Sequence, residues 1–260
     1  MELGLRGRRA LVTGASQGIG RAVARELAAE GVDLALCARG RAALEDAALE
    51  ARDAGVRVFA RPLDVTDAAA VTAFVGEAAA ALGGIDIVVN NAGRARPGTF
   101  ATLTDQAWKA DLDVKLMAQI RVTRAALGSL RASGRGRVIN VNAVAGRQVQ
   151  PGLMATTTNR AACLAFTKSL AQELAPDAIL VNSVNIGLVL TPQWENIRAH
   201  LAPDAELGTF TSEMAKRSVP LARFGTPEEV SGLIAFLCSD RASYITGASI
   251  DVSGGLGSYV

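Results

Sequence analysis

Three closely spaced glycines, Gly14, Gly18 and Gly20, follow an apolar run and open a helix-favouring stretch in LVTGASQGIGRAVARELAAEG. Such a turn uses one glycine for the tight bend, a second so that the backbone can approach a pyrophosphate, and a third for packing the helix on the strand. The N-terminus of the helix that follows also favours phosphate. The pattern therefore predicts a dinucleotide-binding turn. Its other members are Ser16, Gln17 and Ile19.

The second apolar run ends in LALCARGR, with Ala38 and Arg39 where a site for a ribose 2′-hydroxyl would carry Asp or Glu. An arginine matches a 2′-phosphate, whereas a carboxylate would repel it. This favours NADP(H) over NAD(H) as the cofactor. The alternative is that Arg39 is an ordinary surface arginine, like its neighbour Arg41.

A second group of polar residues lies in MATTTNRAACLAFTKSL, residues 154–170, where three threonines, Asn159 and Arg160 precede an apolar run. Locally these side chains suit the start of a helix, because threonine and asparagine are good capping residues. The same cluster could line an active site. The local pattern leaves both interpretations open.

Apolar runs of strand length recur and end in turn residues. They are RALVT, DLALCA, VRVFARPLDV, IDIVVNNAG, GRVINVNA and ILVNSVNIG. Ala-rich stretches that favour helices separate them, at 20–30, 41–54, 68–81, 105–131 and 158–175. This alternation predicts an α/β fold, a doubly wound parallel sheet with helices on both faces, in a single domain 1–260.

The alternation stops after the sixth predicted strand, and residues 191–225 follow without a strand pattern. A segment of that length is usually functional, and we expect it to act as a substrate lid. Its large side chains, Trp194, Phe210 and Met214, are expected to cover an apolar pocket or the subunit core.

A last helix and a last strand are predicted near the C-terminus. In TPEEVSGLIAFLCSD, Thr226 is placed as the helix cap, Pro227 at the first helical position and Glu229 at the third, which forms a capping box. GASIDVSGG then supplies the last strand.

Composition excludes several classes of function. The 27 Lys and Arg nearly balance the 25 Asp and Glu and form no basic stripe, so nucleic acid is not an expected partner. Three distant cysteines, Cys37, Cys163 and Cys238, have neither disulfide nor metal-ligand spacing, and we expect buried thiols and no metal site. No signal peptide or membrane span is indicated, which predicts a cytoplasmic protein.

Several motifs together resemble the classical short-chain dehydrogenases/reductases, including members like the 3-oxoacyl-(acyl carrier protein) reductases. They are TGASQGIG, LDV, NNAG, AFTKSLAQELAP, VNSVNIG and PLARFGTPEEV, in that family's order and spacing over almost the whole chain. The resemblance implies a Rossmann-type subunit with seven parallel strands. It also implies a homo-oligomer, a tetramer or a dimer, formed through the helices that contain Asp111 and Lys168.

The resemblance also implies further cofactor contacts. They are Asp64 and Val65 at the adenine, Asn90, Ala92 and Gly93 at the ribose and pyrophosphate, and Gly187, Val189 and Thr191 at the carboxamide and phosphates. Simpler roles are open, because Asp64 could cap a turn and Thr191, before Pro192, could cap a helix. The family usually has proline where this chain has Ile186.

The family transfers hydride between a nicotinamide and a carbonyl or alcohol with an Asn, a Ser, a Tyr and a Lys. Residue by residue, the positions of this tetrad hold Lys115, Ala143, Thr156 and Arg160. The chain's two tyrosines, Tyr244 and Tyr259, lie near its C-terminus, too far along the chain to be the missing acid. Carbonyl reduction by the usual tetrad is therefore expected to be absent or very weak.

The chemical reason is the acidity of the proton donor. Tyrosine has a reference pKa of about 10, which a neighbouring cation lowers, whereas a threonine hydroxyl is a far weaker acid. Arg160 could still bond a ribose but cannot relay a proton, since guanidinium stays protonated. Ala143 lacks a hydroxyl to polarise a substrate oxygen.

Three other side chains are candidates for the missing chemistry. Lys115 could polarise a carbonyl or act as an acid or base, or it could simply pair with Asp111 or Asp113. His200 could protonate a substrate from the lid, or it could be a solvated residue at a helix end. Cys163 is expected to pack in the core, with nucleophilic chemistry as the alternative.

Three functions follow for a small-molecule site of this kind. The first is an NADP(H)-dependent oxidoreductase with an unusual proton donor, acting on a carbonyl or alcohol substrate. The second is a catalytically silent binding or assembly subunit, which could form a hetero-oligomer with an active relative. The third is a non-redox isomerase, lyase or cyclase in the same cavity.

Overall fold

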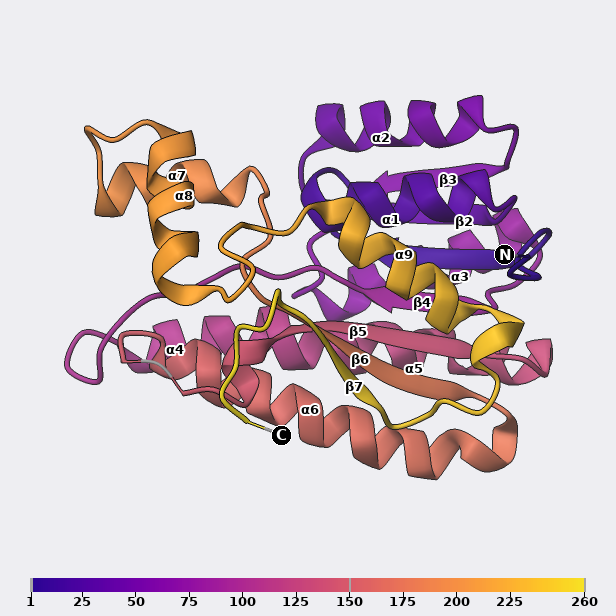
Figure 1. The fold of residues 1–260 in the computed structure, drawn as a ribbon. Coiled ribbons are helices and arrows are strands. Elements are labelled where there is room, and N and C mark those ends of the chain that lie inside the picture. The colour runs from indigo at the N-terminus through magenta and orange to yellow at the C-terminus, as the bar shows by residue number, and fades with distance from the viewer. Residues whose placement is uncertain (1, 150, 260) are drawn as a thin grey trace.

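A sheet of seven parallel strands, in the order β3-β2-β1-β4-β5-β6-β7, forms the centre of the molecule. The computed structural model describes residues 2–149 and 151–259 (Figure 1). The strands are β1 (Arg9–Thr13), β2 (Asp33–Ala38), β3 (Val58–Pro62), β4 (Ile87–Asn90), β5 (Arg137–Ala143), β6 (Leu180–Ile186) and β7 (Ser249–Val252). The predicted doubly wound parallel sheet is confirmed. Its order reverses between β1 and β4, which is where such sheets bind nucleotides.

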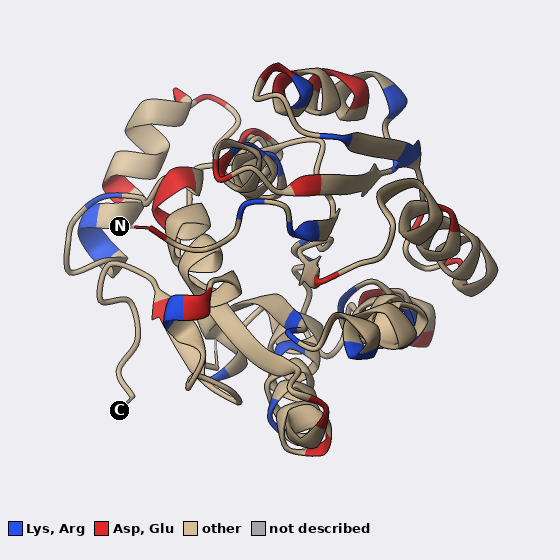
Figure 2. Ribbon diagram, turned by 90° about the vertical axis from the view of Figure 1, so that its right-hand side faces the viewer, with Lys and Arg blue, Asp and Glu red and all other residues tan. Residues whose placement is uncertain are grey.

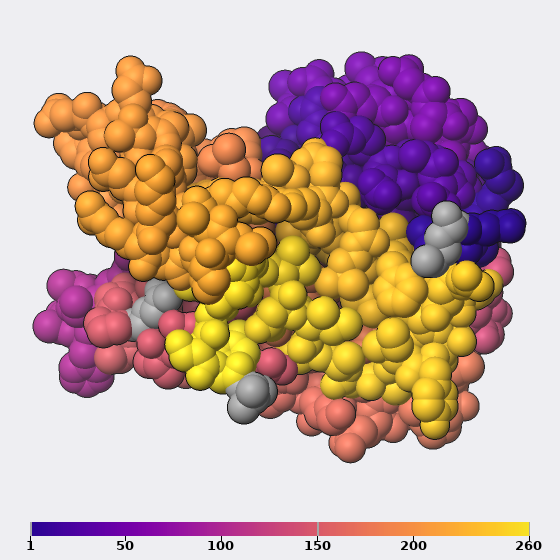
Figure 3. All heavy atoms as spheres, viewed as in Figure 1, coloured from indigo at the N-terminus to yellow at the C-terminus, as the bar shows by residue number. Residues whose placement is uncertain are grey.

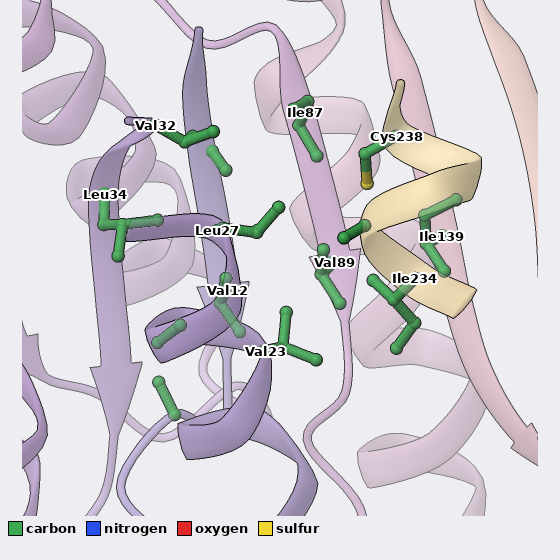
Figure 4. Packing of buried hydrophobic residues seen from close by; sticks show 14 of the residues in the cluster. Val12, Val23, Leu27, Val32, Leu34, Ile87, Val89, Ile139, Ile234 and Cys238 are labelled. Carbon is green, nitrogen blue, oxygen red and sulfur yellow. The ribbon is translucent and has the colours of Figure 1, made fainter. Parts of the chain in front are cut away.

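Helices cover both faces of the sheet (Figure 1). One face holds α1 (Gly18–Ala29), α2 (Arg41–Asp53) and α9 (Pro227–Cys238); the other holds α3 (Ala68–Leu82), α5 (Ala118–Ser133) and α6 (Met154–Leu174). In Figure 4, Val23 and Leu27 of α1 and Ile234 of α9 pack against Val12 and Val89 of the sheet. Burial of both strand faces explains the continuous apolar strand sequences.

The helix predicted over 105–131 is confirmed as one unbroken helical run, but its hydrogen-bond pattern changes in the middle. It consists of α4 (Asp105–Leu112), a π-helical turn at Asp113–Met117, and α5. One extra residue per turn rotates the side chains that follow, and such turns are frequent at functional sites. Short 3₁₀ turns lie at Val144–Gly146, Ala175–Asp177 and Asp240–Ala242.

Residues 191–225 contain no strand, as predicted, and form an excursion beyond the sheet. They form α7 (Gln193–Leu201) and α8 (Leu207–Ser218). Val189 and Gly225 form an isolated parallel bridge at the base of this excursion. In Figure 1 the two helices (orange) stand beyond the end of the sheet, and Figure 3 shows a notch between them and the indigo and purple N-terminal part.

The predicted capping box at the start of α9 is confirmed. The hydroxyl of Thr226 accepts the backbone N–H of Glu229, and the carboxylate of Glu229 accepts the backbone N–H of Thr226. Pro227 occupies the first helical position. Arg223 also donates to Glu229 through both terminal nitrogens of its guanidinium.

A chain of hydrogen-bonded polar side chains runs from the carboxyl end of β4 into the interior of the molecule. Asn90 on β4 donates to Asn140 on β5 at 2.9 Å, and Asn140 donates to Thr167 on α6 at 2.9 Å. Asn90 also donates to Thr123 on α5 at 3.0 Å. These buried hydrogen bonds join two strands and two helices.

The distribution of charge on the surface and the state of the cysteines are as the composition predicts. Acidic and basic positions are interspersed in the view of Figure 2. Cys37, Cys163 and Cys238 are free and buried, as predicted. Within residues 2–149 and 151–259, no helix is long and apolar enough to cross a membrane, and no group of three His, Cys, Asp or Glu could hold a metal.

Candidate active site

The glycine turn has the geometry that its sequence predicts. Gly14 and Gly18 have φ angles of 67° and 55°, in the left-handed region that favours glycine. A Cβ on Gly20 would lie 2.2 Å from the carbonyl oxygen of Gly14, so no larger residue fits there. Gln17 precedes α1 without a side-chain cap, which leaves the first N–H groups of α1 suited to an anion.

A neighbouring asparagine, which the sequence interpretation missed, holds this turn in place. The amide of Asn91 donates to the backbone carbonyls of Thr13 at 3.0 Å and Gly14 at 3.2 Å. The hydroxyl of Thr13 accepts the backbone N–H groups of Asn91 and Ala92, both at 3.0 Å. The doubled asparagine in NNAG was the available signal: Asn90 points into the interior and Asn91 toward the turn.

The adenine end of the predicted site combines a carboxylate with two arginines. Asp64 accepts the backbone N–H and the hydroxyl of Thr66, so its simpler role as a turn cap is confirmed. These hydrogen bonds, followed by the charges of Arg39 and Arg94, hold the pKa of Asp64 below its ordinary value. Arg39 is exposed directly after β2 and lies close enough to Asp64 for its positive charge to lower the pKa of that carboxyl group. Val65 beside it is buried.

The loop after β6 joins the glycine turn on the other side. A Cβ on Gly18 would lie 3.1 Å from the side chain of Thr191, so these two predicted cofactor residues are neighbours. The alternative that Thr191 caps a helix is wrong, since α7 begins after Pro192 without a side-chain cap.

Gly187 has a structural reason to be glycine. Its N–H donates to Val252 at 3.0 Å, and a Cβ there would lie 2.8 Å from the Cα of Ser253. The preceding Ile186 continues β6 and pairs with Val252, where the family usually has proline. Val189 is buried at the base of the α7–α8 excursion.

The chemical end of the site centres on Lys115, in the π-helical turn. Its Nζ lies 2.7 Å and 2.9 Å from the two carboxylate oxygens of Asp111 and 2.8 Å from Oγ1 of Thr156. An ammonium has three N–H bonds, which match these three acceptors. The ion pair with Asp111 is fully buried, which confirms the simpler prediction for Lys115. Asp113 pairs instead with Lys109 and Arg121.

Thr156 lies between this lysine and the loop that follows β4. Its Oγ1 accepts the backbone N–H of Arg96 and donates to the Arg96 carbonyl, both at 3.3 Å. These distances are long for hydrogen bonds to a hydroxyl, so both contacts are weak. Asn159, one helical turn further on, donates to Asp111 at 2.8 Å.

The prediction that the threonines and Asn159 cap the helix is wrong. Helix α6 begins at Met154, four residues earlier than expected, with Leu153 before it and no side-chain cap. Thr156, Thr157 and Asn159 are buried inside its first turns, where they face the rest of the molecule instead of the helix end. The reason is tertiary, because the buried Asp111–Lys115 pair needs polar partners.

Arg160 lies between the strand ends and the predicted ribose position. Its Nη1 donates to the carbonyl of Val141 at 2.9 Å, and its own carbonyl accepts from Asn142 at 3.0 Å. A Cβ on Gly93 would lie 3.2 Å from Nη2 of Arg160. The buried Nε of Arg160 has no partner within the described chain. Ala143 ends β5, where it pairs with Ile186.

Burial governs the electrostatics of this cluster. Burial, followed by the charge of Arg160, lowers the pKa of Lys115, while Asp111 opposes both effects, and the net result is a pKa of about 8. Cys163 is fully buried, as the predicted packing role requires, and burial raises the pKa of its thiol. The pKa of Lys115 is therefore close to neutral pH, where a general acid or base works best.

The remaining candidates lie outside the cluster. His200 is exposed on α7. Trp194 packs edge-on against Phe224 at 4.8 Å between ring centroids and donates to the Val189 carbonyl at 2.8 Å, so it anchors the base of the excursion. Phe210 and Met214 are half-buried on α8.

The similarities to known proteins decide the family. A family model described as enoyl-(acyl carrier protein) reductase matches residues 14–257. The chain belongs to the short-chain dehydrogenase/reductase family. Within that family, a protein assigned as the ketoacyl reductase of the monensin polyketide synthase of Streptomyces virginiae is 43% identical over 255 residues, which cover 96% of this chain and 97% of that protein.

Two solved members of the family are also similar. L-Sorbose reductase from Gluconobacter frateurii, complexed with NADPH and L-sorbose, is 34% identical with a TM-score of 0.97 over 100% of both chains. An NADPH-bound short-chain oxidoreductase from Pseudomonas aeruginosa PAO1, containing an atypical catalytic center, is 37% identical with a TM-score of 0.92, over 99% of this chain and 100% of that one.

Proposed function

We propose that this protein binds NADP(H) and acts as an oxidoreductase on a carbonyl or alcohol substrate, without the family's usual tetrad. The similar proteins support the cofactor, since both solved relatives contain NADPH. The position of Arg39 supports it independently, because an exposed guanidinium after β2 suits a 2′-phosphate.

The residues at the functional edge fit such a cofactor. The uncapped N-terminus of α1 suits a pyrophosphate. The Nη2 of Arg160, which lies beside Gly93, suits a ribose hydroxyl. When bound, NADPH would supply the hydride. Further contacts are proposed for Ser16, Gln17, Ile19, Asp64, Val65, Asn90, Gly187, Val189 and Thr191.

The observation that carries the proposal is the buried hydrogen bond from Lys115 to Thr156. By the sequence resemblance, we propose that Thr156 stands at the position of the family's proton donor and Arg160 at that of its lysine. With Ala143 proposed at the position of the serine, the four positions would lack the groups of the tyrosine mechanism. We propose that any turnover uses a different acid, and that α7 and α8 act as the lid over the substrate.

The test is a titration with NADPH and NADH, followed by a panel of carbonyl and alcohol substrates. We expect NADPH to bind more tightly than NADH and at least one substrate to be turned over. Failure to bind either nucleotide would contradict the proposal at the cofactor. Product formed without net consumption of NADPH would instead favour a non-redox isomerase, lyase or cyclase.

A silent binding subunit is the second candidate, and one observation favours it. The three N–H bonds of Lys115 all have protein acceptors, and the Arg96 backbone contacts the hydroxyl of Thr156 on its other side. This candidate predicts tight NADPH binding with no turnover across the panel, and assembly with an active relative. Size-exclusion chromatography with light scattering would test the proposed dimer or tetramer.

A further inference from the structure

We infer that Lys115 is the proton source of the reaction and that it acts through the hydroxyl of Thr156. The inference rests on the proposed function and names the acid that replaces the missing tyrosine. Thr156 is the group that would touch the substrate oxygen. Lys115 lies behind it and would hold, deliver and recover the proton.

The contacts form one continuous buried path. Asp111 fixes the ammonium of Lys115 with both carboxylate oxygens, and Asn159 holds that carboxylate. The third N–H of Lys115 points at Oγ1 of Thr156 over 2.8 Å. The side chains of Lys115 and Asp111 are fully buried, and Thr156 is 6% exposed. The path therefore has a defined direction, from Asp111 on α4 through the π-helical turn to α6.

The chemistry needs both members. A threonine hydroxyl is too weak an acid to protonate a carbonyl oxygen alone, because it would be left as an unstabilised alkoxide. A buried ammonium hydrogen-bonded to the same oxygen removes that difficulty, since it supplies a proton as the hydroxyl gives one up. Lysine suits this role because burial shifts its pKa readily, whereas an arginine would stay protonated.

The proton balance closes for reduction of a carbonyl group. The carbonyl carbon receives the hydride and its oxygen receives the hydrogen of Thr156, so one O–H bond breaks and another forms. Oγ1 of Thr156 then takes a proton from Nζ of Lys115, which becomes a neutral amine. After the product leaves, a proton from solvent returns to Lys115 through the hydroxyl of Thr156. The net reaction consumes one hydride and one proton. In the oxidation of an alcohol each transfer runs in reverse.

The hydroxyl of Thr156 is free enough to turn toward a substrate. Its contacts with the Arg96 backbone are both 3.3 Å, while the bond from Lys115 is 2.8 Å. Loss of a weak hydrogen bond to the Arg96 carbonyl frees the hydrogen without disturbing the bond from the lysine. The loop that holds Arg96 would have to give way as substrate enters.

The charged and titratable groups that act on Lys115 come from two of the helices packed against its turn. They are Asp111 on α4, and Arg160 and Cys163 on α6. Arg160 and burial favour release of the proton, and Asp111 favours its retention. The pKa of Lys115, at about 8, is the balance of these effects, so the lysine can both lose and recover a proton near neutral pH.

The first test follows the lysine directly and needs no turnover. The chain has four lysines, Lys109, Lys115, Lys168 and Lys216, so the ¹³Cε signals of labelled lysine can be assigned by single substitutions to Arg. We expect one lysine signal to titrate near pH 8, with and without NADP⁺. That signal should be missing from the spectrum of Lys115→Arg. A Lys115 that stays protonated beyond pH 10 would overturn the inference.

The second test compares Thr156→Val, which removes the hydroxyl at nearly constant shape, with Thr156→Ser, which keeps it. We expect Thr156→Val to lower kcat by about 100-fold or more, the range for general acid catalysis, with NADPH affinity and KM little changed. Thr156→Ser should recover most of kcat and keep the wild-type pH profile. For reduction, kcat should fall above about pH 8 as Lys115 loses its proton.

The outcomes separate this inference from the proposed function. NADPH-dependent turnover that Thr156→Val leaves unchanged would overturn the relay and leave the oxidoreductase intact. A panel without any turnover would contradict both. If Lys115→Arg folds and binds NADPH, its rate of reduction should be low, and kcat should no longer fall near pH 8. If kcat of this variant still falls near pH 8, the titrating group is not Lys115.

Discussion

Thr13 and Asn91 hold each other through two hydrogen bonds across adjacent strand ends. The amide of Asn91 donates to the carbonyl of Thr13 at 3.0 Å, and the hydroxyl of Thr13 accepts the N–H of Asn91 at 3.0 Å. The same amide reaches the carbonyl of Gly14 at 3.2 Å. The loop after β4 therefore fixes the shape of the glycine turn after β1.

Asn91→Ala should loosen this turn. We expect a loss of stability of about 1–3 kcal/mol, the cost of leaving buried polar groups without partners, and weaker NADPH binding. Urea unfolding and a fluorescence titration with NADPH measure the two effects. Asn196→Ala, on the exposed face of α7, is the control and should change neither. Unchanged NADPH affinity in a destabilised Asn91→Ala would limit the residue to a structural role.

Arg39→Ala should weaken NADPH binding and leave NADH binding almost unchanged. A charge-assisted hydrogen bond to phosphate contributes about 1.5–3 kcal/mol, which corresponds to a loss of roughly 10- to 100-fold in affinity. Arg41→Ala is the matched control on the first turn of α2. If Arg41→Ala lost the NADPH preference and Arg39→Ala kept it, the phosphate contact would belong to the neighbouring arginine.

Removal of one partner of the Lys115–Asp111 ion pair should lower the stability of the protein strongly. Lys115→Met leaves the Asp111 carboxylate buried without its cation, which typically costs about 3–5 kcal/mol. The double variant Asp111→Asn, Lys115→Met removes both charges and should regain much of that stability. Urea unfolding measures both.

The exposed pair Lys109–Asp113 is the comparison for that experiment. Lys109→Met should cost about 1 kcal/mol or less, because solvent screens the pair. Equal losses in Lys109→Met and Lys115→Met would contradict the buried position of Lys115.

The capping box of α9 should make stability depend on pH in acid. The Arg223 guanidinium and the Thr226 N–H hold the pKa of Glu229 at about 2, below its ordinary value of 4.5. The depressed pKa means that the contribution is complete above pH 4.5 and is lost as the pH falls toward 2. The difference in Tm between wild type and Glu229→Gln should shrink over that interval. A constant difference from pH 6 to pH 3 would show that the charge of Glu229 is not involved.

The sheet and the order of its helices were predictable because each buried strand is a short apolar run ending in turn residues. Boundaries failed where tertiary contacts override local preference. Helix α6 starts before its threonines, because Thr156 and Asn159 serve buried partners instead of the helix end. The π-helical turn was not foreseen, since the pattern through Asp113–Met117 is continuous with its neighbours.

The site was predictable in parts. The spacing of Asp111 and Lys115 is that of a pair one helical turn apart, so their ion pair could be expected from the sequence. The bond from Lys115 to Thr156 joins residues separated by 41 positions and could not. At Gly187 the resemblance to the family suggested a cofactor contact. The structure shows a second reason for glycine at this position, because a larger residue would clash with Ser253.

The hydrogen bonds of Asn140 have a consequence for how the molecule opens. Asn140 joins β4 through Asn90 and α6 through Thr167, so detaching either element alone leaves buried amide or hydroxyl groups unsatisfied. The backbone amides of β4, β5 and α6 should therefore exchange for deuterium together, as one cooperative unit of the native state. Helices α7 and α8, joined to the sheet at the Val189–Gly225 bridge, should exchange earlier and as a separate unit.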